Sequence, residues 1–385
     1  MCMIAYTNYL FDGRVRSEAE VLADSGFRVL CLTNKSGSKP TSFQLDGVTV
    51  RELNVSKYQG KNPIGYLASY LLFLLLSSAA CCRLLLRREL DVVHAHNLPD
   101  FLVLAGLLPR LRGKKVVLDV HDSIAETFAT KFAGMPLARK ILLLEEKLSF
   151  LVAHRIICVN VPQQELLINR GTPSSKTSVC MNAPDRRLFK RSLHQTSPQH
   201  GFHLVYHGTM AERLGVDLII TAIAHLRERV PQLFLHLWGG GDDLEAFQDL
   251  ARELGLDEQV LFKPAGVPLH ELSDRLSQMN LGVVGNRRSV ATELMLPVKL
   301  MEYVALEIPV VAPRLRTIER YFSDDMITFF EPGDVESMSN AIELLIRQPD
   351  LARTRAKQAT TFLDTHGWNH QSEELVRFYK ALVEN

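Results

Sequence analysis

Lys299 and Glu302 form the most informative pair of chemically active residues in the chain. They lie in the segment LPVKLMEYVALEIPVVA, where Pro297 suits the first turn of a helix, and a spacing of three residues puts both side chains on one face. A lysine beside a helix N-terminus suits a diphosphate, and a carboxylate one turn further on could accept hydrogen bonds from the two hydroxyls of a ribose. Two isolated residues of this kind would more often form a surface ion pair, so the assignment depends on their surroundings.

Two glycine-containing segments follow predicted strands in the same half of the chain. In YHGTMAERLGVDL, Gly208 follows a strand and Arg213 stands at the start of a helix. Backbone N–H donors, a helix N-terminus and a guanidinium together suit a phosphate. In LWGGGDD, Gly240 is the middle one of three glycines that permit a close approach of the backbone, although a tight turn would need the same residues.

Histidines lie at the ends of two predicted strands in the first half. The motif HAHN contains His96, and the motif DVHD contains His121 between Asp119 and Asp122, which could orient the imidazole or tune its pKa. Such strand ends are where ligands bind in open α/β sheets. A metal site built from four residues of the two motifs is the disfavoured alternative, because a ligand-binding role accounts for them without a metal.

The first strand–helix turn carries a weaker signal. The segment FDGRVRSEAEVL puts Gly13 at this turn, but it lacks the G-x-G-x-x-G pattern of a dinucleotide site. A plain turn would also explain this glycine. The absence of the pattern argues against a nicotinamide-binding domain.

The elements that position these residues follow one rhythm. Short β-rich apolar runs alternate with helical patterns and predict βα units with parallel sheets. The rhythm pauses over residues 186–200, a polar stretch that we interpret as a linker, and then restarts. This predicts an N-terminal domain over 1–185 and a C-terminal domain over 201–360. The tail, 361–385, ends in a predicted amphipathic helix.

Composition excludes several classes of protein. With 385 residues, 46% hydrophobic and 23% charged, the chain fits a two-domain globular protein and neither a disordered nor a collagen-like one. The first 190 residues carry 25 basic and 16 acidic side chains, whereas the remainder carries 19 and 27, so a general nucleic-acid binder is disfavoured. Six cysteines without C-x-x-C or metal-ligand spacing, and no signal peptide, predict a reducing cytosolic location.

Residues 65–82 contain no charged side chain, and Arg83, Arg87 and Arg88 follow at once. The length is borderline for a transmembrane helix, but the strand that follows must join the sheet, so we reject a span. Two interpretations remain for a helix over 65–86. It is either buried on the sheet, or it has one face on the sheet and another in the lipid interface of an anionic membrane.

Taken together, these segments resemble the retaining nucleotide-sugar glycosyltransferases of GT-B fold, the fourth family in the usual classification. The likeness runs over nearly the whole chain, from DGRVRSEAEVLADSGFRV to the terminal GWNHQSEELVRFY. It implies an α/β fold of two Rossmann-like, doubly wound parallel-sheet domains facing a central cleft. The first domain would take the acceptor and the second the nucleotide-sugar, and the last helix would cross back to the first domain.

The resemblance also implies roles for individual residues. Glu302 looks like the ribose-binding glutamate of the family's E-x7-E motif, and Arg213 and Lys299 would hold the diphosphate. His121 looks like the histidine that reaches the donor sugar near the reacting carbon.

The chain departs from the family pattern in two places. The first glutamate of the motif would fall at Leu294, with Glu293 one position away, and Thr209 replaces the common arginine of the phosphate loop. Lys299 is expected to supply the missing charge. The full set expected at the donor is Gly13, Gly208, Arg213, Gly240, Glu293, Lys299 and Glu302, with His121, Arg213 and Lys299 active in catalysis and His96 and Asp122 on the acceptor side.

The implied activity is transfer of a sugar, with retention, from a nucleotide-diphosphate sugar to a glycan or polyprenyl-diphosphate-linked acceptor. No D-x-D motif is present, so we expect no metal and no cofactor, with Arg213, Lys299 and a helix N-terminus stabilising the leaving diphosphate. The expected place is the inner face of the plasma membrane, in surface or exopolysaccharide synthesis. The alternatives are a soluble transferase acting on a small acceptor and a non-catalytic nucleotide-sugar binding module; a sugar-nucleotide epimerase ranks lower.

Overall fold

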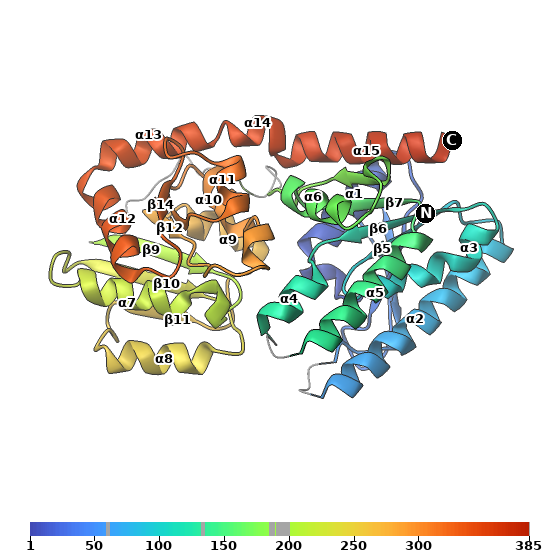
Figure 1. The fold of residues 1–385 in the computed structure, drawn as a ribbon, viewed down its shortest axis with the longest axis horizontal. Helices are drawn as coiled ribbons and strands as arrows, with labels where there is room; N and C mark the ends of the chain where they lie inside the picture. Colours follow the sequence, from blue (N-terminus) through green and yellow to red (C-terminus); the bar gives the residue numbers. More distant parts are fainter. Residues whose placement is uncertain (59–61, 132–134, 185–188, 190–200, 385) are drawn as a thin grey trace. The chain divides into compact units, whose positions relative to one another are not determined.

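The computed structural model describes residues 1–384 except 59–61, 132–134, 185–188 and 190–200. Most of the expected linker, 186–200, therefore lies outside the described residues. The chain divides into two compact units: Met1–Asn182 with Gln371–Asn385, and Ala183–His370. Each unit is an α/β domain around one sheet, and the two sheets are parallel apart from one edge pair (Figure 1).

Unit 1 contains an eight-stranded sheet of order β3-β4-β2-β1-β5-β6-β7-β8, in which only β3 and β4 pair antiparallel. Its strands are β1 Cys2–Ile4, β2 Leu30–Asn34, β3 Ser42–Leu45, β4 Val48–Leu53, β5 Val92–His96, β6 Lys115–Val120, β7 Arg155–Cys158 and β8 Thr177–Val179. Its helices are η1 Tyr9–Phe11, α1 Gly13–Asp24, α2 Pro63–Leu86, η2 Asp100–Gly106, α3 Leu107–Leu111, α4 Ile124–Lys131, α5 Pro136–Val152, α6 Val161–Asn169 and η3 Ser174–Lys176.

Unit 2 contains a six-stranded parallel sheet of order β11-β10-β9-β12-β13-β14. Its strands are β9 Phe202–His207, β10 Leu233–Trp238, β11 Val260–Lys263, β12 Leu281–Val283, β13 Val310–Pro313 and β14 Thr328–Phe330. Its helices are η4 Glu212–Leu214, α7 Val216–Leu226, α8 Leu244–Glu253, α9 Leu269–Leu276, η5 Thr292–Leu294, α10 Val298–Ala305, α11 Arg316–Tyr321, α12 Val335–Arg347, α13 Pro349–Ala359 and α14 Phe362–His366. The chain then continues into α15, Trp368–Glu384.

Two hydrophobic clusters cover the two faces of the unit 1 sheet. One face carries buried side chains of α2, η2 and α5, and the other carries those of α1 together with Leu375, Tyr379 and Leu382 of α15. The apolar spacing in the C-terminal segment therefore corresponds to a helix that packs on unit 1. The two α/β domains with parallel sheets predicted from the sequence are present.

Helix α2 begins at an asparagine cap, where Asn62 Oδ1 accepts the N–H of Ile64 at 3.0 Å. It is the one helix among the described residues that is long and apolar enough to cross a membrane by length and composition, yet only 22% of its most apolar window is buried. Phe73, Ser77 and Cys81 are buried against the sheet. Other apolar side chains of the helix, among them Leu71 and Leu75, are exposed, so burial on the sheet accounts for only one face.

A matched pair of substitutions tests this packing. Phe73→Ala removes a fully buried ring and should lower the free energy of unfolding by about 3–5 kcal/mol. Leu75→Ala alters a side chain that is 66% exposed and should change it by less than about 0.5 kcal/mol. Urea denaturation measures both, and equal effects would mean that α2 does not pack on the sheet through Phe73.

Candidate donor site and the buried charge cluster

The carboxyl end of β9 brings together the residues that the sequence analysis singled out in unit 2. Strand β9 lies between β10 and β12 in the sheet, and Gly208 follows it directly with a φ of 109°, a conformation that favours glycine. A Cβ at Gly208 would lie 3.5 Å from Lys299 Nζ. Helix α10, which begins at Val298 with Pro297 as its N-cap, supplies both Lys299 and Glu302.

Lys299 is half-buried and packs on an aromatic ring. Its Nζ lies 3.5 Å from the centroid of the Tyr206 ring. Burial lowers the pKa of Lys299 to about 7, with the positive charge of Arg213 acting in the same direction and Glu302 opposing it. Within the described part of the chain, neither Lys299 Nζ nor the Arg213 guanidinium has a hydrogen bond or an ion pair. Two neighbouring cations thus remain available for an anion.

Glu302 and the strand end are held by a small polar network that sequence reasoning missed. Glu302 is 8% exposed, and its Oε2 lies 3.1 Å from His207 Nε2. The Tyr206 hydroxyl donates to the carbonyl of Thr209 at 2.6 Å, and the Tyr303 hydroxyl donates to that of Val205 at 3.2 Å. Both tyrosines thus fix the backbone on either side of His207. The only sequence signal for His207 was its place next to Gly208.

The start of α7 is also braced by charge. Arg287 donates two hydrogen bonds to Asp217, at 2.7 and 2.5 Å, and a third to the carbonyl of Glu212 at 3.0 Å. The carbonyl of Arg213 accepts the N–H of Arg287 at 3.1 Å. Arg213 is thus positioned through its backbone, and its guanidinium forms no hydrogen bond or ion pair with the residues that the structure describes.

Glu293 is already engaged elsewhere in unit 2. It lies in the 3-10 turn η5, where its carboxylate accepts the backbone N–H of Arg316 at 2.6 Å and pairs with Arg288 at 3.0 Å. Among the described residues, it forms no hydrogen bond or ion pair with Lys299 or Glu302. The Glu293 carboxylate therefore already has partners without a ligand, whereas Lys299 and Arg213 form no such bonds with the described residues.

The glycine segment after β10 packs on the segment after β9. Gly240 accepts the N–H of Met210 through its carbonyl at 2.9 Å, and a Cβ at Gly240 would come no nearer than 3.4 Å to another atom. A Cβ at Gly239 would lie 2.1 Å from the carbonyl oxygen of Gly208, and φ at Gly239 is 136°. A Cβ at Gly241 would likewise lie 2.2 Å from the carbonyl oxygen of Met210, so the close approach requires glycine at 239 and 241 but not at Gly240.

In unit 1, the two histidine motifs meet at Asp119. His121 Nε2 lies 2.7 Å and His96 Nδ1 3.1 Å from Asp119 Oδ2, and the two ring nitrogens lie 3.0 Å apart. Arg14 donates to both oxygens of the same carboxylate, at 2.8 and 2.7 Å. The sequence analysis missed Arg14, because an arginine in the first turn of a helix gives no sign of the strand it will meet.

The charges of this cluster follow from burial and pairing. Burial opposes the charge of Asp119, but Arg14 and His121 outweigh it and hold the pKa of Asp119 well below its usual range. Burial also opposes the charge of His121, but Asp119 outweighs it and raises the pKa of His121. The pKa of His96 is lowered by burial, and that of Glu18 is raised to about 8 for the same reason. Asp119 therefore favours the protonated form of His121, whereas burial favours the neutral forms of His96 and Glu18.

Glu18, His94, His96 and Asp119 could each offer one ligand atom to a metal, because these atoms lie within 4.8 Å of one another. Arg14 already fills the cationic role, since its Nη2 bridges Asp119 Oδ1 at 2.7 Å and Glu18 Oε1 at 3.0 Å. A metal ion at the same carboxylates would meet the repulsion of the guanidinium. The donor set therefore fits an arginine and not a resident metal.

The remaining predicted residues of unit 1 lie around this cluster. Gly13 is the first residue of α1, next to Arg14, and no atom lies within 4 Å of a Cβ built on it. Asp122 is exposed, and its backbone is held by Asn97, which donates to the Asp122 carbonyl at 2.8 Å and accepts the N–H of His121 at 2.7 Å. The cluster thus positions His121 from both its side chain and its backbone.

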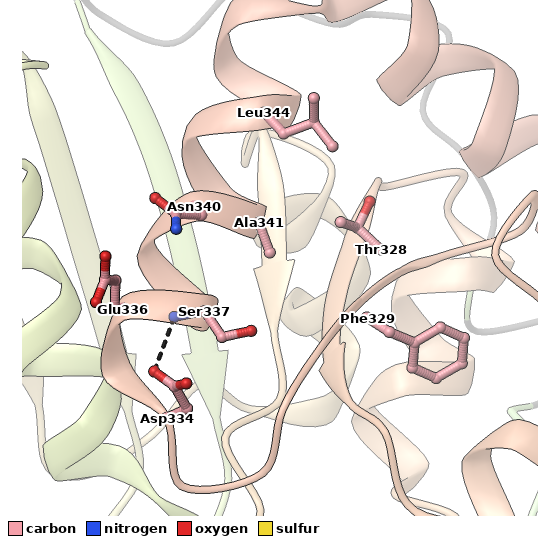
Figure 2. Close-up of a pocket in the computed structure, with 8 residues that line it drawn as sticks. All are labelled: Thr328, Phe329, Asp334, Glu336, Ser337, Asn340, Ala341 and Leu344. Atoms are coloured by element: carbon pink, nitrogen blue, oxygen red, sulfur yellow. Dashed lines mark hydrogen bonds between the residues drawn. The ribbon is translucent and has the colours of Figure 1, made fainter.

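A separate cavity of about 450 Å³ lies between β14 and α12 of unit 2 (Figure 2). Its polar lining includes Asp334, which caps α12 by accepting the N–H of Ser337 at 2.9 Å. None of the residues predicted from the sequence lines it. The cavity is therefore distinct from the β9–α10 site, although both belong to unit 2.

Both units match known glycosyltransferase domains. The sequence model described as "Glycosyl transferase 4-like domain" matches residues 13–183, and the one described as "Glycosyl transferases group 1" matches residues 194–362. A GDP-mannose-dependent alpha-(1-6)-phosphatidylinositol monomannoside mannosyltransferase from Mycolicibacterium smegmatis is 31% identical over 143 residues, which is 36% of this chain and 37% of that protein. The match thus spans well under half of that relative.

Solved structures share the fold over the full length. Sucrose-phosphate synthase from Thermosynechococcus elongatus superposes with a TM-score of 0.80 at 18% identity, covering 99% of both chains. Anabaena HepE in complex with UDP-glucose superposes with a TM-score of 0.74 at 15% identity, again covering 99% of both chains. At these identities the likeness concerns the fold alone, which is GT-B.

The two neighbouring glycines give a test of the strand-end geometry. Gly239→Ala should lower the free energy of unfolding by at least about 1–3 kcal/mol, because the new methyl group meets a carbonyl oxygen and the backbone conformation disfavours a side chain. Gly240→Ala adds the same methyl group in open surroundings and should cost less than about 1 kcal/mol. Urea unfolding compares them, and a Gly239→Ala protein as stable as the wild type would refute the close packing.

Proposed function

By the families of both its domains this chain belongs to the GT-B glycosyltransferases, and we propose that it moves a sugar, with retention of configuration, from a nucleotide-diphosphate sugar to a glycan or polyprenyl-diphosphate-linked acceptor. We further propose that it works peripherally at the cytoplasmic face of the plasma membrane, in surface or exopolysaccharide synthesis. Neither a cofactor nor a nucleic acid is part of this proposal.

One observation carries the proposal: Lys299 and Arg213, two basic side chains close enough to interact, form no hydrogen bond or ion pair with any of the described residues. The diphosphate of a donor would supply the missing charge, and Gly208 would let its oxygens approach the backbone. Glu302, three residues after Lys299, would accept the ribose hydroxyls. A donor of this class agrees with the complex of HepE with UDP-glucose and with the dependence of the mycobacterial relative on GDP-mannose.

The proposed reaction needs no protein nucleophile. The bond between the anomeric carbon and the diphosphate breaks, the acceptor oxygen forms the new bond on the same face, and the acceptor proton passes to a diphosphate oxygen. Lys299 and Arg213 would stabilise the negative charge that grows on the leaving group. His121, by the family resemblance, would contact the donor sugar, where its raised pKa favours a hydrogen-bond donor over an acceptor.

We propose that the reaction is independent of a metal ion. Two cations in the β9–α10 site would neutralise charge that a divalent metal neutralises in other transferases. EDTA should therefore leave the rate unchanged. A loss of all activity in EDTA that manganese restores would contradict this part of the proposal.

A second candidate function is a binding module that holds a nucleotide-sugar without turning it over. The observation in its favour is that Glu293, next to the first glutamate position of the family motif, is already bound to Arg288 and to the N–H of Arg316. A soluble transferase acting on a small acceptor is the other alternative. It shares the donor site, so only the acceptor and the membrane separate it from our proposal.

The pKa of Lys299 predicts how nucleotide affinity depends on pH. Because that pKa is lowered to about 7, the free protein loses the charge as the pH rises above 7, whereas a bound diphosphate holds the proton on the amine. The affinity for a nucleoside diphosphate should therefore fall by up to about ten-fold per pH unit between pH 7 and 9. Calorimetric titration should also detect proton uptake on binding.

Two variants are the controls for this pH dependence. Lys299→Met should bind weakly with little dependence on pH, and Lys299→Arg should bind with a flat profile because its side chain stays charged. The same steep profile in Lys299→Met as in the wild type would contradict the assignment of Lys299.

The enzymatic proposal is tested by offering labelled UDP-, GDP-, ADP- and dTDP-sugars to the full chain with a polyprenyl-diphosphate-linked acceptor. Lys299→Ala and Glu302→Gln should each lower kcat/KM by about 100-fold or more, as expected for lost diphosphate and ribose contacts. Lys357→Ala, on the exposed side of α13, is the matched control and should have no effect. Donor binding without transfer or donor hydrolysis would favour the binding module, and transfer that survives both site changes would refute the site.

A further inference from the structure

Helix α5 exposes an apolar stripe along its whole length. Leu137, Ile141, Leu144, Leu148 and Leu151 recur at intervals of three and four residues, and each is between 53% and 70% exposed. A surface helix of a globular protein normally turns polar residues to water at these positions. An exposed apolar stripe of this size is typical of a surface that binds a membrane or another protein.

The stripe belongs to a larger surface formed by neighbouring elements. The 3-10 helix η2 contacts both α2 and α5. Helix α3 contacts α2, and Figure 1 shows these two helices next to each other. Each of these elements adds exposed leucines: Leu67, Leu71, Leu72 and Leu75 from α2, Leu104 from η2, and Leu107, Leu108 and Leu111 from α3. We call these residues and the α5 stripe the leucine surface.

The exposed charged residues within α2, η2, α3 and α5 are all basic, although Glu89 and Asp91 are exposed shortly after α2. Lys140 and Lys147 are exposed on α5, Arg83 on α2, and Arg112 directly after α3. No carboxylate of α2, η2, α3 or α5 is exposed. By contrast, the exposed charged residues of α8 in unit 2 are mainly acidic: Glu245, Asp249, Arg252 and Glu253.

The acidic residues of these elements are turned away from water. Glu146 is buried and pairs with Arg170 at 3.0 Å. Glu145 is half-buried, accepts the hydroxyl of Ser149 at 3.0 Å, and has a pKa that burial raises to about 7. Asp100 of η2 is 2% exposed and accepts the side-chain N–H of Asn97 at 2.9 Å. The exposed residues of these elements are thus mainly leucines and basic residues, and their carboxylates are buried or half-buried.

We propose that the leucine surface is the face by which this protein lies on an anionic lipid bilayer, with α5 and α2 as two contact lines joined by η2 and α3. This inference rests on the proposed membrane-face function and extends it from α2 to a surface of four elements. The leucines would enter the boundary between headgroups and acyl chains, and the lysines would reach the lipid phosphates along the rim.

Charge selects a bilayer over a second copy of the chain as the occupant. Two leucine surfaces in a symmetric dimer would bring Lys140, Lys147 and Arg112 of each copy toward like charges. Anionic headgroups instead supply the negative charge that these exposed residues lack. Each lysine near such a surface contributes about a five-fold gain in affinity, and salt screens this gain.

Vesicle flotation with the full chain tests the proposal. The wild type should float with phosphatidylcholine vesicles that contain 30 mol% phosphatidylglycerol, about ten-fold or more better than with phosphatidylcholine alone, and less well in high salt. Ile141→Gln/Leu148→Gln should reduce binding at least about ten-fold. Lys140→Glu/Lys147→Glu should reduce it by about 25-fold or more on anionic vesicles.

Matched double variants away from the leucine surface serve as controls. Leu261→Gln/Val383→Gln replaces two apolar side chains of 40% and 47% exposure, and Lys357→Glu/Lys380→Glu makes the same charge change on α13 and α15. Both should float like the wild type. Far-UV circular dichroism reports that each variant is folded, and binding of a nucleoside diphosphate is measured in parallel without vesicles.

Two results would overturn the proposal. One is flotation that the α5 variants do not weaken. The other is a wild type that binds no lipid but is a dimer by light scattering. If Ile141→Gln/Leu148→Gln is then a monomer, the leucine surface is a dimer interface. A protein that floats as expected but binds no nucleotide-sugar would refute the proposed transferase and leave the lipid surface standing, so the two failures are distinguishable.

Discussion

Two basic side chains at the end of β9, Lys299 and Arg213, lack an ion-pair partner among the described residues, and the proposed donor site depends on this feature. The fold maintains them by backbone packing: Gly239 lets the β10 end lie against Gly208, and Tyr206 offers its ring to Lys299. Burial makes the Lys299 charge costly, as its lowered pKa near 7 records. A bound anion would stabilise the charged form of Lys299. The same burial that disfavours this charge in the free protein therefore favours anion binding.

In the charge cluster of unit 1, by contrast, the buried charge already has its partners within the protein. Asp119 is fully paired, with Arg14 on both oxygens and two histidines on one of them. The network continues through His94, whose ring stacks on His96 and whose Nδ1 lies 2.7 Å from the Tyr379 hydroxyl of α15. The C-terminal helix thus takes part in holding the histidines, which explains why a tail remote in sequence packs on the first unit.

Sequence patterns predicted the fold class, since the alternation of apolar strands and helices reports directly on parallel βα units. They also placed Lys299 and Glu302 on one helix face, because helical spacing is a local property. They missed Arg14, His207 and Gly239, whose importance arises from contacts between strand ends. The α5 stripe escaped notice because the run ILLLEEKLSFLV has the composition of a core helix, and only exposure shows that its leucines face outward.

The most direct test of the central claim is a crystal structure of the full chain in complex with the nucleoside diphosphate that binds it best. The account predicts electron density for the diphosphate beside Gly208, Arg213 and Lys299, with the ribose hydroxyls on Glu302. Density in the cavity between β14 and α12, with the β9–α10 site unoccupied, would contradict it.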